Sequence, residues 1–90
     1  MKRLKQDLNT SDDSFSYTLI GEAEPLYRVD NDGRLTKSGV EIGKFVLGDN
    51  QWHLCIDGVM VDSGPQNGLF KLPEFELKAL TSLVNLEPSK

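Results

Sequence analysis

Hydrophobic and polar residues alternate along much of the chain, as they do in strands that bury one face. In FSYTLIG, which begins at Phe15, every second residue is aromatic or aliphatic, and this predicts a strand over about residues 15–23. All eight glycines lie between Gly21 and Gly68, at spacings typical of short strands and turns. The middle of the chain is therefore predicted to form strands joined by tight turns.

Two similar segments follow one another in this glycine-containing zone. Residues 27–48 align with residues 52–73 at an offset of 25 positions. The shared positions are mostly turn residues: Asp32 with Asp57, Gly33 with Gly58, Ser38 with Ser63, and Gly39 with Gly64. Asp-Gly between apolar runs is a hairpin signal, because glycine accepts the positive φ of a primed turn. We therefore expect two tandem hairpins, which arose either by duplication or by independent use of the same turn residues.

The segment VEIGKFVLG changes the phase of its apolar residues. Val40 and Ile42 are in step with each other, but Phe45 and Leu47 are out of step with them. A strand that changes phase carries an extra residue, so this segment is predicted to have a bulge or a bend at Gly43.

The C-terminal part of the chain has the period of a helix. Pro73 suits a first helical residue, and the apolar spacing that follows predicts a helix over about residues 73–86. Its apolar arc also includes Leu77, Leu80 and Val84, so it spans roughly half of the helical circumference. Either a curved sheet covers the helix on two sides, or these three residues form an interface for another protein or a second copy.

These patterns predict one α+β domain over residues 15–90, in which the C-terminal helix packs on an antiparallel sheet of four or five strands. The sheet is expected to contain the two similar tandem hairpins. Residues 1–14 are polar and are predicted to form a flexible tail, basic at first and then acidic. We expect a cytoplasmic location and no membrane contact, because the basic start is followed by no apolar segment and no run approaches ~18 apolar residues.

Charge is unevenly distributed. The chain has 14 acidic and 10 basic residues, and three of the basic ones, Lys2, Arg3 and Lys5, lie in the first six positions, which leaves a net charge of −7 on the rest. Because an acidic domain repels phosphates, direct nucleic-acid binding is disfavoured. The acidity either only keeps the domain soluble or docks it on a basic groove of a partner. The candidate carboxylates for such docking are Glu22, Glu24, Asp30, Asp32, Asp49 and Asp62.

Chemically reactive residues gather in one segment, WHLCIDG. His53, Cys55 and Asp57 occupy alternate positions there, and they include the single histidine and the single cysteine. Same-face neighbours on a strand lie about 6–7 Å apart, too far for a cysteine–histidine dyad, which needs contact at ~3 Å. Asp57 also belongs to a predicted turn. We therefore interpret the segment first as a hairpin with Cys55 beside Met60, and expect neither a metal nor a cofactor.

The sequence favours a non-enzymatic protein-binding module of the inhibitor, immunity or adaptor type, which occupies a surface of a larger partner. One candidate for that surface is a basic groove that binds nucleic acid. One alternative is a structural homodimer or higher homo-oligomer formed through the C-terminal helix. Another is a metal or thiol site protein that uses His53, Cys55 and Asp57.

Overall fold

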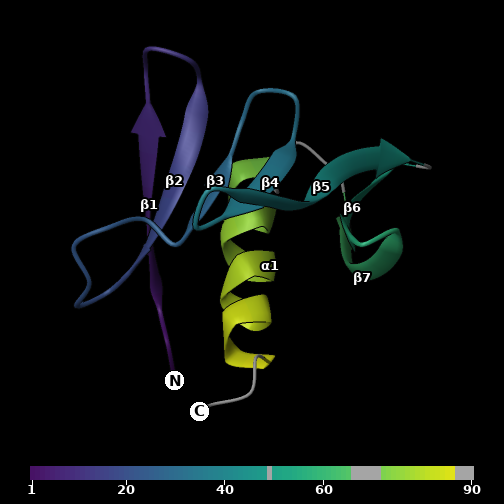
Figure 1. Ribbon diagram of the computed structural model, residues 1–90. Coiled ribbons are helices and arrows are strands. Elements are labelled where there is room, and N and C mark those ends of the chain that lie inside the picture. The colour runs from purple at the N-terminus through teal and green to yellow at the C-terminus, as the bar shows by residue number, and fades with distance from the viewer. Residues whose placement is uncertain (49, 66–71, 87–90) are drawn as a thin grey trace.

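The computed structural model describes residues 1–48, 50–65 and 72–86. They form a seven-stranded sheet and one helix (Figure 1). In chain order the elements are β1 (Leu4–Asn9), β2 (Ser14–Leu19), β3 (Tyr27–Val29), β4 (Arg34–Lys37), β5 (Val40–Gly48), β6 (Gln51–Ile56), β7 (Val59–Pro65) and α1 (Leu72–Leu86). The spatial order of the strands is their order in the sequence, and every neighbouring pair is antiparallel. None of the described helical residues belongs to a helix long and apolar enough to span a membrane.

The α+β class and the C-terminal helix agree with the prediction, but the count of four or five strands is wrong. One unpredicted strand is β1, which lies within the segment expected to be a tail. Leu4 and Leu8 pair with Leu19 and Phe15 of β2. The residue between the two leucines on that face is Gln6, whose polar side chain hides the alternation that would have revealed the strand.

The tandem-hairpin prediction is only partly matched. Asp57-Gly58 forms the two-residue β6–β7 turn with φ values of 52° and 78°, as Asp-Gly predicts. Ser38-Gly39, with φ values of 51° and 84°, makes a second two-residue turn between β4 and β5. The aligned Ser63-Gly64 makes no turn and continues β7 opposite β6. The difference follows from the length of the facing strand. The strand before Ser38-Gly39, β4, faces only the three residues of β3, whereas β7, which contains Ser63-Gly64, faces the six residues of β6.

The predicted irregularity at Gly43 is confirmed. Leu35 pairs with Gly43, whereas the next residue, Thr36, pairs with Glu41, so Ile42 is the extra residue of a bulge in β5. Gly43 also pairs with Ile56 of β6, and a Cβ atom at Gly43 would collide with the backbone oxygen of Cys55. The bulge therefore needs a residue without a side chain where Gly43 lies against Cys55 of β6.

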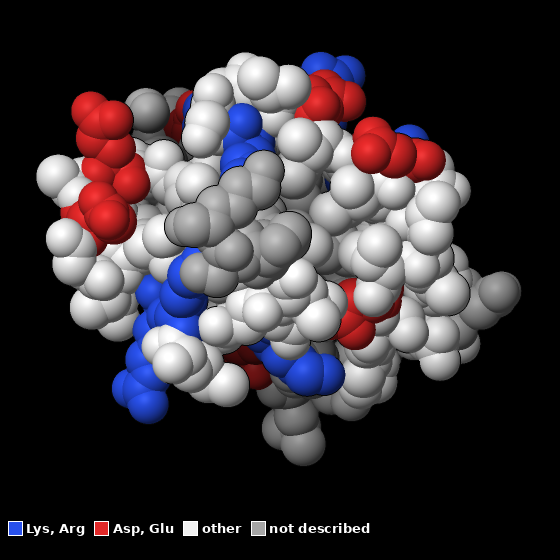
Figure 2. All heavy atoms as spheres, turned by 60° about the horizontal axis from the view of Figure 1, so that its bottom comes forward, with Lys and Arg blue, Asp and Glu red and all other residues white. Residues whose placement is uncertain are grey.

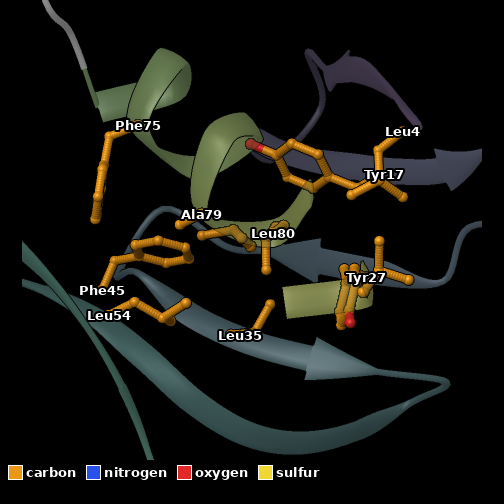
Figure 3. Close-up of a cluster of buried hydrophobic side chains, with 11 residues drawn as sticks. Leu4, Tyr17, Tyr27, Leu35, Phe45, Leu54, Phe75, Ala79 and Leu80 are labelled. Carbon is orange, nitrogen blue, oxygen red and sulfur yellow. The ribbon is translucent and has the colours of Figure 1, made fainter. Parts of the chain in front are cut away.

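The hydrophobic core lies between α1 and one face of the sheet (Figure 3). Its centre contains Phe45 of β5 and Phe75 of α1, whose rings meet edge to face with centroids 5.8 Å apart. The helix contacts β1 at one edge of the sheet and β6 and β7 at the other. The sheet must therefore curve around α1. The buried core residues are Leu4, Tyr17, Tyr27, Val29, Leu35, Phe45, Leu54, Phe75, Ala79, Leu80 and Val84.

Candidate functional site

The structure does not bring His53, Cys55 and Asp57 together as a reactive cluster. Leu54 points into the core, so His53 and Cys55 on either side of it project from the opposite face of β6. Asp57 lies in the β6–β7 turn. Cys55 is a free thiol paired with Met60 across the hairpin, as expected. No group of three or more histidine, cysteine or acidic residues able to hold a metal ion occurs among the described residues.

Two buried nitrogen atoms of β6, Trp52 Nε1 and His53 Nδ1, have no hydrogen-bond partner. Trp52 packs against the core, whereas His53 lies on the outer face of the sheet. Because the two side chains leave opposite faces of the strand, the two nitrogens do not form one site.

The candidate carboxylates are spread over the sheet. Glu22 and Glu24 lie in the β2–β3 loop, whereas Asp30 and Asp32 lie in the β3–β4 turn at the opposite end of β3. Asp30 is already engaged, because its Oδ1 accepts hydrogen bonds from the backbone N–H groups of Asp32 and Arg34, both at 2.9 Å. These four carboxylates therefore do not gather into a single acidic site.

The two remaining candidate carboxylates are Asp62 and Asp49. Asp62 is half-buried in β7, and Asp49 lies outside the described residues. On the face shown in Figure 2, acidic side chains form separate groups toward the rim, with basic side chains between them. That face therefore offers no continuous acidic patch.

The apolar residues proposed as a helix interface are mostly core residues. Leu80 and Val84 are 0% and 1% exposed, and Leu77 is partly buried against the same core. The wide apolar arc of α1 arises because the curved sheet covers the helix on two sides, and Leu80 and Val84 are therefore unavailable to a partner in this fold. In contrast, Leu86 at the end of α1 is 78% exposed.

A buried polar cluster links α1 to the first two strands and was not predicted from the sequence. The hydroxyl of Tyr17 donates to Oε1 of Glu76 at 2.5 Å, and Nε2 of Gln6 donates to the Tyr17 oxygen at 2.9 Å. The Tyr17 ring extends toward the helix in Figure 3. One signal was present in the sequence, because Glu76 lies four residues before Leu80 and eight before Val84, on the apolar stripe itself.

Burial changes the acidity of both groups in this cluster. Glu76 is 3% exposed, and burial raises the pKa of its carboxyl to about 7 even though the hydrogen bond from Tyr17 lowers it. Burial, together with the neighbouring Glu76, also raises the pKa of Tyr17. The pair joins the helix to the sheet within the core and so has the features of a structural link.

The most exposed apolar run in a described strand lies on β7. Val59, Met60 and Val61 are 62%, 58% and 49% exposed, and we refer to these three residues as the β7 patch. The patch follows Asp57 in the turn and precedes Asp62 in the strand. Val61 and Asp62 also line, with Leu83 and Leu86 of α1, a small cavity of about 20 Å³.

No protein-family model, curated protein or solved structure matches this chain.

Proposed function

We propose that this chain is a small non-enzymatic protein-binding module that occupies a surface of a larger, basic partner protein. The observation that carries the proposal is the β7 patch, a run of three exposed apolar residues in an acidic hairpin. Between Lys44 and Lys71 the sequence has no lysine or arginine but has three aspartates, Asp49, Asp57 and Asp62.

The composition of this hairpin fits the anatomy of a protein interface. Such interfaces have an apolar centre that excludes water and a polar rim that sets orientation. Val59 and Met60 project from opposite faces of β7, so the β7 patch supplies apolar surface on both sides of an edge strand, and Asp57 and Asp62 add negative charge before and after it in the sequence. A partner with lysine or arginine around an apolar surface is complementary to this arrangement, and a basic nucleic-acid-binding groove is one surface of that kind.

An inhibitor, immunity or adaptor role follows from such occupation. An acidic module on a basic groove excludes whatever else binds there. The burial of Leu80 and Val84 gives no support to a homo-oligomer formed through α1.

A matched pair of variants tests the proposal. Val59 and Val40 each follow a two-residue turn, and they are 62% and 63% exposed. Val59→Lys and Val40→Lys therefore make the same change of charge and polarity in similar surroundings, but only the first alters the β7 patch. Each variant and the wild type are immobilised, exposed to an extract of the host cells and washed, and the retained proteins are identified by mass spectrometry.

The expected result is a basic protein that the wild type and Val40→Lys both retain and that Val59→Lys does not. The affinity of Val59→Lys for this protein should be at least tenfold lower than that of the wild type. Its affinity for the wild type should fall as salt increases, because the charges are exposed and screened. Equal retention by both lysine variants would show that the β7 patch does not carry binding. Binding that is insensitive to salt would disprove the electrostatic part of the proposal.

A further inference from the structure

The two edges of the sheet differ in how far they are closed. At the β1 edge, α1 is hydrogen-bonded near both of its ends, to the side chain of Gln6 in β1 and to the backbone of Lys2 just before β1. Nε2 of Gln6 donates to the backbone oxygen of Pro73 at 2.8 Å. The Asn85 side chain accepts from the Lys2 backbone N–H at 2.9 Å and donates to the Lys2 backbone oxygen at 3.0 Å. The backbone of Lys2, just before β1, is therefore already bonded to the helix, whereas the contact at Gln6 is made by its side chain and leaves the backbone edge of β1 unoccupied by any described residue.

In the second half of β7, the backbone at the outer edge is poorly suited to pairing with another strand. The backbone N–H of Ser63 donates to the Asp62 carboxylate at 2.8 Å, so this group is already satisfied. Pro65 at the end of the strand has no N–H to offer. The register also slips by one residue at Val61, which makes Val61 the extra residue of a bulge. Each of these features makes pairing with another strand less favourable.

The first half of the β7 edge remains open. Ile56 and Val59 flank the two-residue turn, so they form the hydrogen-bonded pair nearest to it. The next pair, Cys55 with Met60, is then a non-hydrogen-bonded pair, and this register directs the N–H and C=O of Met60 to the outer edge. In the part of the chain that the structure describes, no strand lies beyond β7.

We propose that an extended segment of the partner, rich in apolar residues and lysine or arginine, pairs with β7 at Met60 as an additional strand of the sheet. This inference rests on the proposed binding function and specifies how that function is performed. The backbone of Met60 supplies the hydrogen bonds, and the exposed side chains of Val59 and Val61 supply apolar contact.

The charges around Met60 select the chemistry of the incoming segment. Asp57 and Asp62 lie on either side of the β7 patch, and the hairpin has no lysine or arginine to pair with them. A second copy of the chain pairing through β7 brings the same two aspartates and adds like-charge repulsion. A second copy pairing through β1 would have to pair beside Lys2, whose backbone N–H and oxygen already bond to Asn85 of α1. The charge around Met60 favours a basic segment, and the concentration dependence described below distinguishes a segment of another protein from a second copy.

The test uses two synthetic peptides and does not require the partner to be identified. One labelled ten-residue peptide alternates valine with lysine, and the other alternates valine with glutamate. Binding to the wild-type chain, Met60→Pro and Met60→Ala is measured by fluorescence anisotropy. Proline removes the outward N–H, whereas alanine shortens the side chain and keeps the N–H, so the pair separates backbone pairing from side-chain contact.

The valine–lysine peptide should bind the wild type and Met60→Ala within about threefold of each other, and Met60→Pro at least tenfold more weakly. The valine–glutamate peptide should bind at least tenfold more weakly than its lysine counterpart. Equal binding by the two Met60 variants, equal binding of the two peptides, or no binding to the wild type would overturn the inference.

Hydrogen exchange keeps the inference testable if Met60→Pro does not fold. In the wild type, exchange of the Met60 amide should slow when the valine–lysine peptide is added, while that of the Leu8 amide on the opposite edge stays unchanged. An unchanged Met60 amide would contradict strand pairing. Protection of the Met60 amide without peptide, rising with protein concentration, would show that a second copy occupies the edge and would also overturn the inference.

These outcomes separate the inference from the proposed function. A captured partner that Met60→Pro retains as well as Met60→Ala does would disprove strand pairing and leave the binding function standing. Peptide binding at Met60, combined with no partner specific to the β7 patch, would support the edge chemistry and count against the proposed function.

Discussion

The hydroxyl of Tyr17 donates a hydrogen bond to the carboxyl of Glu76 at 2.5 Å and so joins β2 to α1 across 59 positions of sequence. Gln6 donates to the same hydroxyl and to the backbone of Pro73, so one small cluster ties the start of the helix to two strands. In this cluster the ionisable carboxyl of Glu76 is hydrogen-bonded to the neutral hydroxyl of Tyr17. Its protonation state therefore bears directly on the stability of the fold.

The first prediction concerns pH. The pKa of Glu76 is raised from 4.5 to about 7 in the folded chain, so the folded state binds this proton more tightly than the unfolded state does. Its contribution to stability is fully present below about pH 4.5 and is lost as pH rises through 7, by roughly 3 kcal/mol at most. Urea unfolding at pH 5 and pH 8 measures this loss.

Glu76→Gln should reduce the difference in unfolding free energy between pH 5 and pH 8, because glutamine does not ionise. Glu74→Gln is the matched control, since Glu74 is exposed in the same helix turn and should leave the difference unchanged. An equal pH dependence in the wild type and Glu76→Gln would show that Glu76 does not titrate in this range.

Removal of the Tyr17 hydroxyl should destabilise the protein, and more so at high pH. Tyr17→Phe leaves the Glu76 oxygen without its donor, at a cost of about 1–3 kcal/mol. Because the hydrogen bond from Tyr17 lowers the pKa of Glu76, its loss should raise that pKa further. A carbon-13 NMR titration of the Glu76 carboxyl measures the change, and a titration midpoint that stays the same or falls would contradict the hydrogen bond.

Two positions near the end of α1 should respond very differently to a negative charge. Val84→Glu places a carboxylate in the core and should cost roughly 3 kcal/mol or more. Leu86→Glu, two residues later at an exposed site, should change the unfolding free energy by less than about 0.5 kcal/mol. Thermal unfolding of both variants provides the comparison, and a stable Val84→Glu protein would show that the helix does not pack as described.

Two glycines of β5 provide a test of the close approach to β6. Gly43→Ala should cost roughly 1–3 kcal/mol, because its Cβ atom meets the backbone of Cys55, which a side-chain rotation cannot relieve. Gly48→Ala should be tolerated, since its Cβ atom would lie 3.8 Å from the nearest atoms, those of the His53 ring. Similar denaturation midpoints for the two variants would mean that β5 and β6 are further apart at the bulge.

The parts of the fold that were predictable from sequence are those set by neighbouring residues. The Asp57-Gly58 turn, the alternation of β2 and the period of α1 each depend on a few consecutive positions. Ser38-Gly39 and Ser63-Gly64 show the limit of such reasoning, because the same dipeptide turns in one place and extends in the other. The length of the facing strand decides between the two outcomes, and that length is not a property of the dipeptide.

The candidate site was less predictable for the same reason. A glutamate in the first turns of a helix normally faces water, where the helix dipole stabilises its charge, so only the position of Glu76 on the apolar stripe set it apart from Glu74. Its burial depends on Tyr17 in a strand far away in sequence. Likewise, the apolar β7 patch differs from a buried strand only because β7 is the last strand of the sheet.

The order of elements along the chain also has a consequence for biosynthesis. Each strand pairs with its immediate neighbour in sequence, so the sheet can assemble hairpin by hairpin while the polypeptide leaves the ribosome. The helix that covers its apolar face comes after all seven strands. Until residues 72–86 emerge, Leu35, Leu54 and Tyr27 have no helix to pack against, and the nascent chain passes through a stage that favours aggregation or chaperone binding.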